Sequence, residues 1–294
     1  MKADQLSQTA TFIAIKFYGL TRIDDFQTLF DASTIKFYDK LVTSLPAPLS
    51  YYHYWLQLGW IRKLYIWSEE LLLPGDLLHI MGRKWIIGHI LENLVDEGYE
   101  QIIVLGAGFD HLSHKYMQQD VSCIELDTPH MAELKRRFLD EYYPNSRRPR
   151  ILDVHLPNDN IDTIFSNEQQ INPHKKTIIV AEGFFDYLSS ETVSLLLQQI
   201  GNYFTAPPKL VGTHFALDEL SAFRRTVFTR SVQIVGEKLS FNTSVTEFRQ
   251  LLQDNNYQIQ LMQGAKDIRQ RIVQHVDTDL PILPGFYIFK AQKK

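Results

Sequence analysis

Two glycines stand where a predicted strand ends and could bring the backbone close to a ligand. The segment 105–110 (LGAGFD) begins at the last residue of the short apolar run 102–105 and precedes a helix-like segment. Because glycine has no Cβ, Gly106 and Gly108 allow a sharp turn and a close ligand approach. A dinucleotide fingerprint needs a third glycine at position 111, which is His111 here. The loop therefore fits a smaller nucleoside ligand, although a simple tight turn also explains it.

A carboxylate could bind a ribose at the end of the next apolar run, residues 121–126. Asp127 lies 21 residues after Gly106, where an acid can accept hydrogen bonds from both ribose hydroxyls. The same aspartate precedes Thr128-Pro129 and an amphipathic segment, a pattern that also fits a helix N-cap. Glu125 faces the other side of the strand or is displaced along it. Only one of the two acids can therefore take the ribose role.

Two further strand candidates also end in acids. Residues 151–154 contain Asp153, which could hydrogen-bond an exocyclic amine such as that of adenine, and residues 177–181 precede Glu182. Each acid alone fits a cap or a turn. Parallel strands end at one edge of an open α/β sheet, which is where such sheets bind ligands. Together the glycines and acids predict an adenosine-type cofactor without phosphate contacts.

The elements that must position these residues alternate between strand and helix patterns. Beside the four runs above, strands are predicted at 209–214, 257–262 and 286–289, and helices at 129–141, 189–202 and 245–255. This alternation predicts an α/β fold over residues 99–294, a Rossmann-like, doubly wound and mostly parallel seven-stranded sheet.

The first third of the chain reads as helical and rich in aromatic residues. Residues 79–95 carry apolar side chains at helical spacing, and Gly98 is the predicted stop of this helix. We interpret residues 1–98 as a helical cap on a single domain spanning 1–294. Core packing or a substrate pocket would explain the aromatic side chains of Tyr51, Tyr52, Tyr54, Trp55, Trp60, Tyr65 and Trp67.

Composition excludes several classes of protein. The 294 residues carry a net charge of −4 and a single cysteine, Cys123, which rules out an intrachain disulfide and suits a cytoplasmic location. No segment has the length of a membrane span or the pattern of a signal peptide. The basic stretches 135–137 and 147–148 are interpreted as solvated faces. Neither a nucleic acid nor a membrane is expected as a partner.

Three segments resemble the leucine carboxyl methyltransferase family, which includes polyketide-type O-methyltransferases. They are residues 103–110 (IVLGAGFD), 125–129 (ELDTP) and 181–188 (AEGFFDYL). Thr9-Ala10, residues 81–84 (MGRK) and residues 236–241 (GEKLSF) fall where the family has its threonine–alanine element, its cofactor-binding arginine and its late Gly-Glu-Pro segment. The likeness spans most of the chain.

The resemblance implies that S-adenosylmethionine binds at the sheet edge. Gly106 and Gly108 would lie against it, Asp127 would hold the ribose, and Asp153 with the backbone of Val154 would meet the adenine.

The resemblance also implies how the amino-acid end of the cofactor is held. Glu182 would face the methionine ammonium, and Arg83 would pair with the methionine carboxylate, to which a guanidinium is geometrically matched. Lys16 is either a second cation at this end or a solvated lysine.

The acceptor of the methyl group is less constrained. A carboxylate is ionised at neutral pH and needs no base, whereas a hydroxyl would need one, and His155 or Tyr187 is the nearest candidate. Tyr187 could also be a rim residue. His155 stands where relatives that act on a peptide terminus have an arginine. A small-molecule acceptor is therefore expected rather than a protein C-terminus.

The sequence thus predicts an enzyme, an S-adenosylmethionine-dependent O-methyltransferase acting on a carboxylate or a phenol. One alternative is a regulatory protein that binds the cofactor without turnover. Another is an NAD(P)-dependent oxidoreductase, which the missing third glycine disfavours. No metal is expected, because His111 and His114 lack an evident third ligand. A homodimer remains open.

Overall fold

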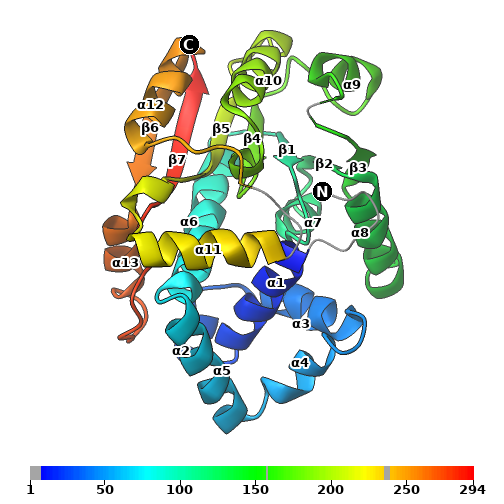
Figure 1. Cartoon of the computed structure of the whole chain (residues 1–294). Helices are drawn as coiled ribbons and strands as arrows, with labels where there is room; N and C mark the ends of the chain where they lie inside the picture. Colours follow the sequence, from blue (N-terminus) through cyan, green and yellow to red (C-terminus); the bar gives the residue numbers. More distant parts are fainter. Residues whose placement is uncertain (1–7, 157, 235–238) are drawn as a thin grey trace.

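A seven-stranded sheet forms the centre of the protein in the computed structural model, which describes residues 8–156, 158–234 and 239–294 (Figure 1). The strand order is β3-β2-β1-β4-β5-β7-β6. The strands are β1 Gln101–Leu105, β2 Ser122–Asp127, β3 Arg150–Asp153, β4 Thr177–Ala181, β5 Lys209–Phe215, β6 Tyr257–Gln263 and β7 Phe286–Lys293. All seven predicted strands are present. Residues 236–238 of the late motif lie outside the described residues.

The sheet is mixed, because β7 runs antiparallel to both of its neighbours. It pairs with β5 from Lys209↔Gln292 to Phe215↔Phe286 and also pairs with β6. The other pairings are parallel. The predicted mostly parallel sheet is confirmed, and the sequence did not indicate that β7 is the antiparallel strand. Apolar runs do not encode strand direction, which depends on where the chain re-enters the sheet.

Helices cover both faces of the sheet. Successive strand residues point to opposite sides, so Ile102 and Val104 share one core with α6 Asp76–Asp96, α7 Leu112–Met117, α8 Pro129–Tyr142 and α13 Ala265–Ile272. Ile103 and Leu105 share the other core with α9 Ile161–Asn167, α10 Ser190–Tyr203 and α12 Val245–Asp254. The alternation predicted from the sequence is thus the observed doubly wound layering.

From residue 8 onward, the described part of the chain before the sheet contains six helices, in agreement with the helical first third that the sequence predicts. They are α1 Gln8–Leu20, α2 Asp24–Gln27, α3 Ala32–Ser44, α4 Tyr51–Trp55, α5 Gly59–Leu72 and α6. Helix α6 ends at Asp96, and Gly98 follows with φ +84°, in agreement with its predicted role as a stop. Helix α11 Ala222–Ile234 crosses the molecule between the sheet and the first helices (Figure 1). No helix in the described ranges is both long and apolar enough to cross a membrane.

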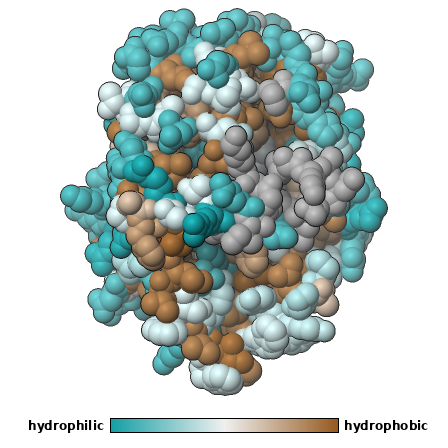
Figure 2. All heavy atoms as spheres, viewed as in Figure 1, coloured by the Kyte–Doolittle hydropathy of each residue, from teal (hydrophilic) through white to brown (hydrophobic). Residues whose placement is uncertain are grey.

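The aromatic residues of α4 and α5 mostly face solvent. Five of the seven singled out above, on α4 and α5, are exposed, and Tyr52 and Tyr65 are half-buried. Hydrophobic residues therefore reach the surface at the lower end of the molecule, where α5 lies (Figure 2). The prediction of core packing is wrong for these five, because helical spacing does not reveal which neighbour an apolar stripe meets.

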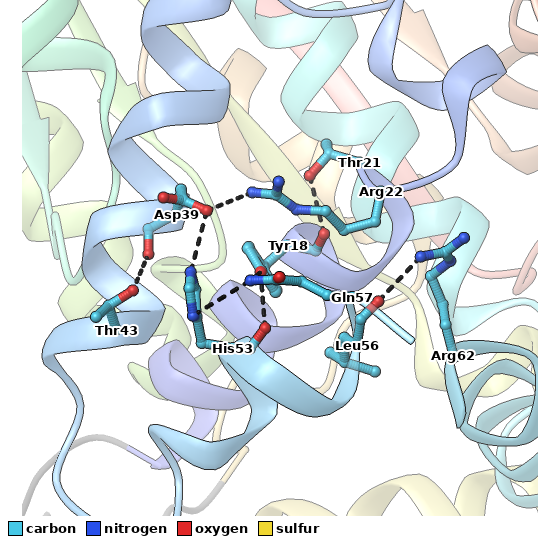
Figure 3. Close-up of polar contacts among 9 residues, drawn as sticks. All are labelled: Tyr18, Thr21, Arg22, Asp39, Thr43, His53, Leu56, Gln57 and Arg62. Atoms are coloured by element: carbon cyan, nitrogen blue, oxygen red, sulfur yellow. Dashed lines mark hydrogen bonds and ion pairs between the residues drawn. The ribbon is translucent and has the colours of Figure 1, made fainter. Parts of the chain in front are cut away.

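Polar contacts help to fasten α4 to the rest of the cap (Figure 3). Asp39 of α3 accepts a hydrogen bond from Arg22, 2.6 Å away, and its Oδ1 lies 3.2 Å from Nε2 of His53 on α4. Tyr18 of α1 donates its hydroxyl hydrogen bond to the backbone carbonyl of His53 at 2.9 Å. This arrangement holds α4 in place while leaving much of its aromatic surface in solvent.

Candidate active site

A cavity of about 520 Å³ opens where the predicted glycines and acids come together. Its wall includes the loop after β1, the ends of β2 and β4, and side chains from α1, α5, α6, α11 and β7. This is the carboxyl edge of the parallel strands, the usual ligand position in open α/β sheets. Cap and sheet therefore enclose one site together.

Asp127 fastens the glycine loop. Its Oδ2 accepts a hydrogen bond from the backbone N–H of Gly108 at 2.6 Å, and its Oδ1 accepts one from that of Thr128 at 2.7 Å. Thr128, not Asp127, is the N-cap residue of α8, and it makes no side-chain cap hydrogen bond. Burial raises the pKa of Asp127, an effect that the two N–H donors oppose. The helix-cap interpretation of Asp127 is therefore wrong.

Gly106 needs to be glycine for two reasons. Its φ is +60°, a conformation that L side chains rarely adopt, and a Cβ there would lie 2.5 Å from Cδ2 of Phe184. Gly108 also has a positive φ, +46°. The glycine loop thus packs directly against the segment after β4, and both glycines line the cavity.

Arg83 and Glu182 meet in the cavity wall as an ion pair. Nε of Arg83 lies 2.9 Å from Oε1 of Glu182, and Nζ of Lys84 donates to the same oxygen at 3.2 Å and to Asp110 at 2.7 Å. Burial alone lowers the pKa of Lys84, but the charges of Asp110 and Glu182 outweigh it and raise that pKa above its ordinary value. The other oxygen of Glu182, Oε2, is buried without a hydrogen-bond partner in the described part of the chain.

Lys16 also lines the cavity, so its interpretation as a solvated lysine is wrong. Its Nζ lies 2.7 Å from Asp76 and 2.8 Å from Glu69, and it therefore links α1 to α5 and α6. Burial lowers its pKa, but the two carboxylates more than compensate and raise it. Asp76 and Glu69 already neutralise this cation.

The structure does not bring every predicted residue to the cavity. Val154 and Tyr187 line it, but Asp153 and His155 do not. The carboxylate of Asp153 is half exposed and ion-paired with Arg136, and His155 is exposed. The cause is the strand order, because β3 is the edge strand and its end lies beside the cavity.

Three cavity residues, Asp76, His79 and Asp186, were not predicted from the sequence. Asp76 and His79 lie seven and four residues before the predicted Arg83, which places all three on one face of the deeply buried helix α6. Polar residues at that spacing in a largely apolar helix were the available signal. Asp186 also lines the cavity, and burial raises its pKa to about 6, although the N–H of Phe215 and the charge of Arg83 oppose this.

Other polar residues singled out from the sequence have structural positions. Glu125 is fully buried and pairs with Lys135 at 2.8 Å, so Lys135 is not part of a solvated face. His111 is buried beside Tyr38, at 5.5 Å between ring centroids. In the described ranges, no group of three or more His, Cys, Asp or Glu side chains is arranged to hold a metal ion.

The fold defines a class of protein. A DUF574 family protein from Streptomyces avermitilis MA-4680 is similar, with a TM-score of 0.59 and 10% identity over 80% of this chain and 91% of that one. A protein of Thermobifida fusca YX assigned as a methyltransferase has a TM-score of 0.55 and 15% identity over 80% and 88%. The chain has the α/β methyltransferase fold. A search of curated protein sequences finds no match.

The comparison with family models is more specific. Residues 70–201 match the model of the leucine carboxyl methyltransferase family. The matched segment runs from the end of α5 to α10 and contains Arg83, the glycine loop, Asp127 and Glu182. The resemblance recognised from the sequence motifs is thereby confirmed.

Proposed function

We propose that the protein transfers a methyl group from S-adenosylmethionine to an oxygen atom of a small-molecule acceptor. The observation that carries this proposal is that Asp127 and the Arg83–Glu182 ion pair line one cavity. The first can hold a ribose, and the second complements an amino-acid zwitterion. The family match supports the same cofactor.

The residues present fit this cofactor. A carboxylate has about four lone-pair positions. Oδ2 of Asp127 accepts one hydrogen bond, from the N–H of Gly108, whereas Oδ1 accepts one from the N–H of Thr128 and a long one, at 3.4 Å, from the Thr128 hydroxyl. Oδ2 thus keeps a position for one ribose hydroxyl, and Oδ1 can accept a second in place of the long Thr128 contact. The unpartnered Oε2 of Glu182 offers an acceptor to an ammonium, and Arg83 offers its guanidinium to a carboxylate. When bound, the cofactor supplies an electrophilic methyl group.

The chain's own task is alignment and exclusion of water. Displacement at a methyl carbon needs the acceptor oxygen in line with the bond that breaks, so fixed positions for both partners lower the barrier. The cap helices and α11 close the cavity over the sheet edge and limit the access of water. The cavity volume lies within the range typical of small-molecule sites.

Calorimetric titration tests the proposal. We expect S-adenosylhomocysteine to bind and NADH not to bind, and transfer of a labelled methyl group to at least one member of a panel of carboxylic acids, phenols and enols. Binding of NADH alone would refute the proposal in favour of an oxidoreductase. Binding of S-adenosylhomocysteine without transfer to any acceptor would instead identify a regulatory binder.

A further inference from the structure

A histidine that the sequence analysis did not single out lies in the cavity wall, next to the proposed cofactor residues. His79 is on α6, four residues before Arg83, so the two share one helix face. At 1.5 Å of rise per residue they are about 6 Å apart along the helix axis. If Arg83 holds the amino-acid end of the cofactor, His79 faces the adjoining part of the cavity.

The ring nitrogens of His79 have no hydrogen-bond partner in the described part of the chain, although the residue is only 2% exposed. Nδ1 lies 3.5 Å from Oδ1 of Asp76, which is long for a hydrogen bond. Buried polar groups in folded proteins are nearly always hydrogen-bonded. An unpartnered imidazole in a cavity wall therefore indicates a ligand with a polar hydrogen.

Burial keeps His79 neutral. Burial lowers its pKa to about 4, and the charges of Arg83 and Lys16 act in the same direction, whereas Asp76 opposes them. Lys16 is itself bound to Asp76 and Glu69. A neutral imidazole has one ring nitrogen free to accept a proton at neutral pH.

Aromatic rings surround this part of the cavity. The ring of His79 is stacked on that of Phe286 at 3.4 Å between centroids, Phe286 on Phe215 at 3.9 Å, and Phe228 meets Phe215 edge-on at 4.5 Å. All of them line the cavity. Such walls favour a flat, unsaturated ligand.

The described cations of the wall do not favour an anionic acceptor. Lys16 is paired with Asp76 and Glu69, and Lys84 is paired with Asp110 and Glu182. Arg83, which also pairs with Glu182, is the cation that the proposed function assigns to the cofactor's own carboxylate. A carboxylate entering the aromatic end would lose hydration without gaining an unpaired cation.

We infer that His79 is the catalytic base for a hydroxyl acceptor, a phenol or an enol, that binds against the aromatic rings. This inference rests on the methyl transfer proposed above and specifies its acceptor. The acceptor oxygen forms a bond to the methyl carbon while the carbon–sulfur bond breaks, and its electron pair stays on sulfur to leave a neutral thioether. The hydroxyl proton passes to the imidazole of His79 and then to solvent. Asp76 is a positioning residue that favours the resulting imidazolium.

The test compares His79→Gln with a matched control, His214→Gln. His214 is also buried and stacked on a phenylalanine, Phe248 at 4.3 Å, and burial lowers its pKa to about 4 as well, but it does not line the cavity. Each variant is assayed near neutral pH with a series of phenols and naphthols of increasing acidity, and S-adenosylhomocysteine binding is measured in parallel.

We expect His79→Gln to lower kcat at least 100-fold with a weakly acidic phenol, the usual contribution of a general base. The loss should be under 10-fold with a nitrophenol that ionises by itself, and the cofactor dissociation constant should stay within twofold of wild type. His214→Gln should keep wild-type kcat for both. An equal loss with both phenols would assign His79 a structural role and overturn the inference.

Failure of this inference differs from failure of the proposed function. If no phenol, naphthol or enol is methylated, the inference is wrong, whether or not a carboxylic acid is methylated. If wild-type protein does not bind S-adenosylhomocysteine, the proposed function itself is wrong.

The outer surface of α5 carries an exposed apolar stripe, an observation that is independent of the cavity. Trp60, Leu64, Trp67 and Leu71 are spaced as one helical stripe and are 70%, 55%, 62% and 67% exposed. No residue of this 14-residue helix is buried. The inner side of α5 supplies Glu69 to the cavity wall, so the stripe faces away from the cavity.

The stripe is self-complementary about a two-fold axis through the middle of α5. An antiparallel copy would place Trp60 opposite Leu71 and Leu64 opposite Trp67, so that each large ring meets a smaller side chain. Such pairing of a surface with itself is the geometry of an isologous dimer. Alternation of large and small residues is how packed helix surfaces interlock.

The exposed area is of the size that a dimer needs. The stripe exposes about 550 Å², near the upper limit for the largest apolar patch of a typical monomer and about two thirds of the roughly 800 Å² that each partner buries in a standard interface. Leu58 and Leu72 lie beside the stripe and are also exposed. We propose that a second copy of this chain covers α5, in an antiparallel two-fold dimer.

Light scattering during size-exclusion chromatography tests this proposal with Leu64→Glu and, as a matched control, Leu195→Glu. Leu195 is similarly exposed, at 53%, but lies on α10. Wild type and Leu195→Glu should have twice the chain mass of 34.3 kDa, and Leu64→Glu should weaken dimerisation at least 100-fold. A monomeric wild type overturns the proposal. A monomer that sediments with phosphatidylglycerol vesicles would identify a membrane as the occupant instead.

Discussion

Replacing Asp127 by asparagine tests the cofactor site most directly. The carboxylate accepts the N–H groups of Gly108 and Thr128 at 2.6 and 2.7 Å, and its remaining lone pairs are those we assign to the ribose. Asparagine keeps the shape but turns one oxygen into an NH₂ donor that faces a backbone N–H. A hydrogen bond to a charged group contributes about 1.5–3 kcal/mol. Affinity for S-adenosylhomocysteine should therefore fall about 10- to 150-fold.

Isothermal titration calorimetry measures this change, and thermal unfolding of the free protein shows how much stability is lost with it. Asp153→Asn is the control, because Asp153 is half exposed, ion-paired with Arg136 and absent from the cavity wall. Its affinity should equal that of wild type. If Asp127→Asn loses thermal stability but binds within twofold of wild type, Asp127 only ties the loop and the ribose assignment is refuted.

Three further substitutions probe the site and its support. Arg83→Ala should weaken S-adenosylhomocysteine binding at least 10-fold. The dissociation constant of 5′-methylthioadenosine, which lacks the amino-acid group, should stay within twofold of wild type, and an equal loss of affinity for both ligands would contradict the pairing of Arg83 with a carboxylate. Burial raises the pKa of Asp186 from 3.8 to about 6, so the folded state holds this proton more tightly and loses stability as pH rises from about 4 to 6. The free energy of unfolding of Asp186→Asn should thus rise by about 2.5 kcal/mol relative to that of wild type between pH 4 and 7 in denaturant titrations, and a difference that does not change with pH would refute this. Lys135→Met should lower the free energy of unfolding by about 3–5 kcal/mol, because it leaves the buried carboxylate of Glu125 without its ion-pair partner. Adding Glu125→Gln should recover most of this loss.

Local sequence determined the strands, most of the helices that cover the sheet and the core of the candidate cofactor site, whereas the short helices α9 and α13 were not predicted. Each buried strand is a short apolar run, and hydrophobic periodicity is a local property of the chain. The glycine loop directly follows β1, and Asp127 ends the neighbouring strand β2, so parallel pairing of β1 with β2 is enough to bring them together. Glu182 follows β4, the other neighbour of β1.

Strand order and packing decided what the local pattern left open. Asp153 and Asp127 both end predicted strands, but β3 is the edge strand, and its carboxylate pairs with Arg136 away from the cavity. His155 lies two residues after Asp153 and is also exposed.

The tertiary structure alone assembled the aromatic end of the cavity and placed the stripe of α5 in solvent. His79 meets Phe286 of the last strand, more than 200 residues later in the chain, and Lys16 of α1 reaches Asp76 of α6. Trp60 and Trp67 have the same spacing whether they enter a core or remain outside. Sequence pattern thus determines which residues share a face, whereas the partner of that face depends on contacts between distant segments that no local period encodes.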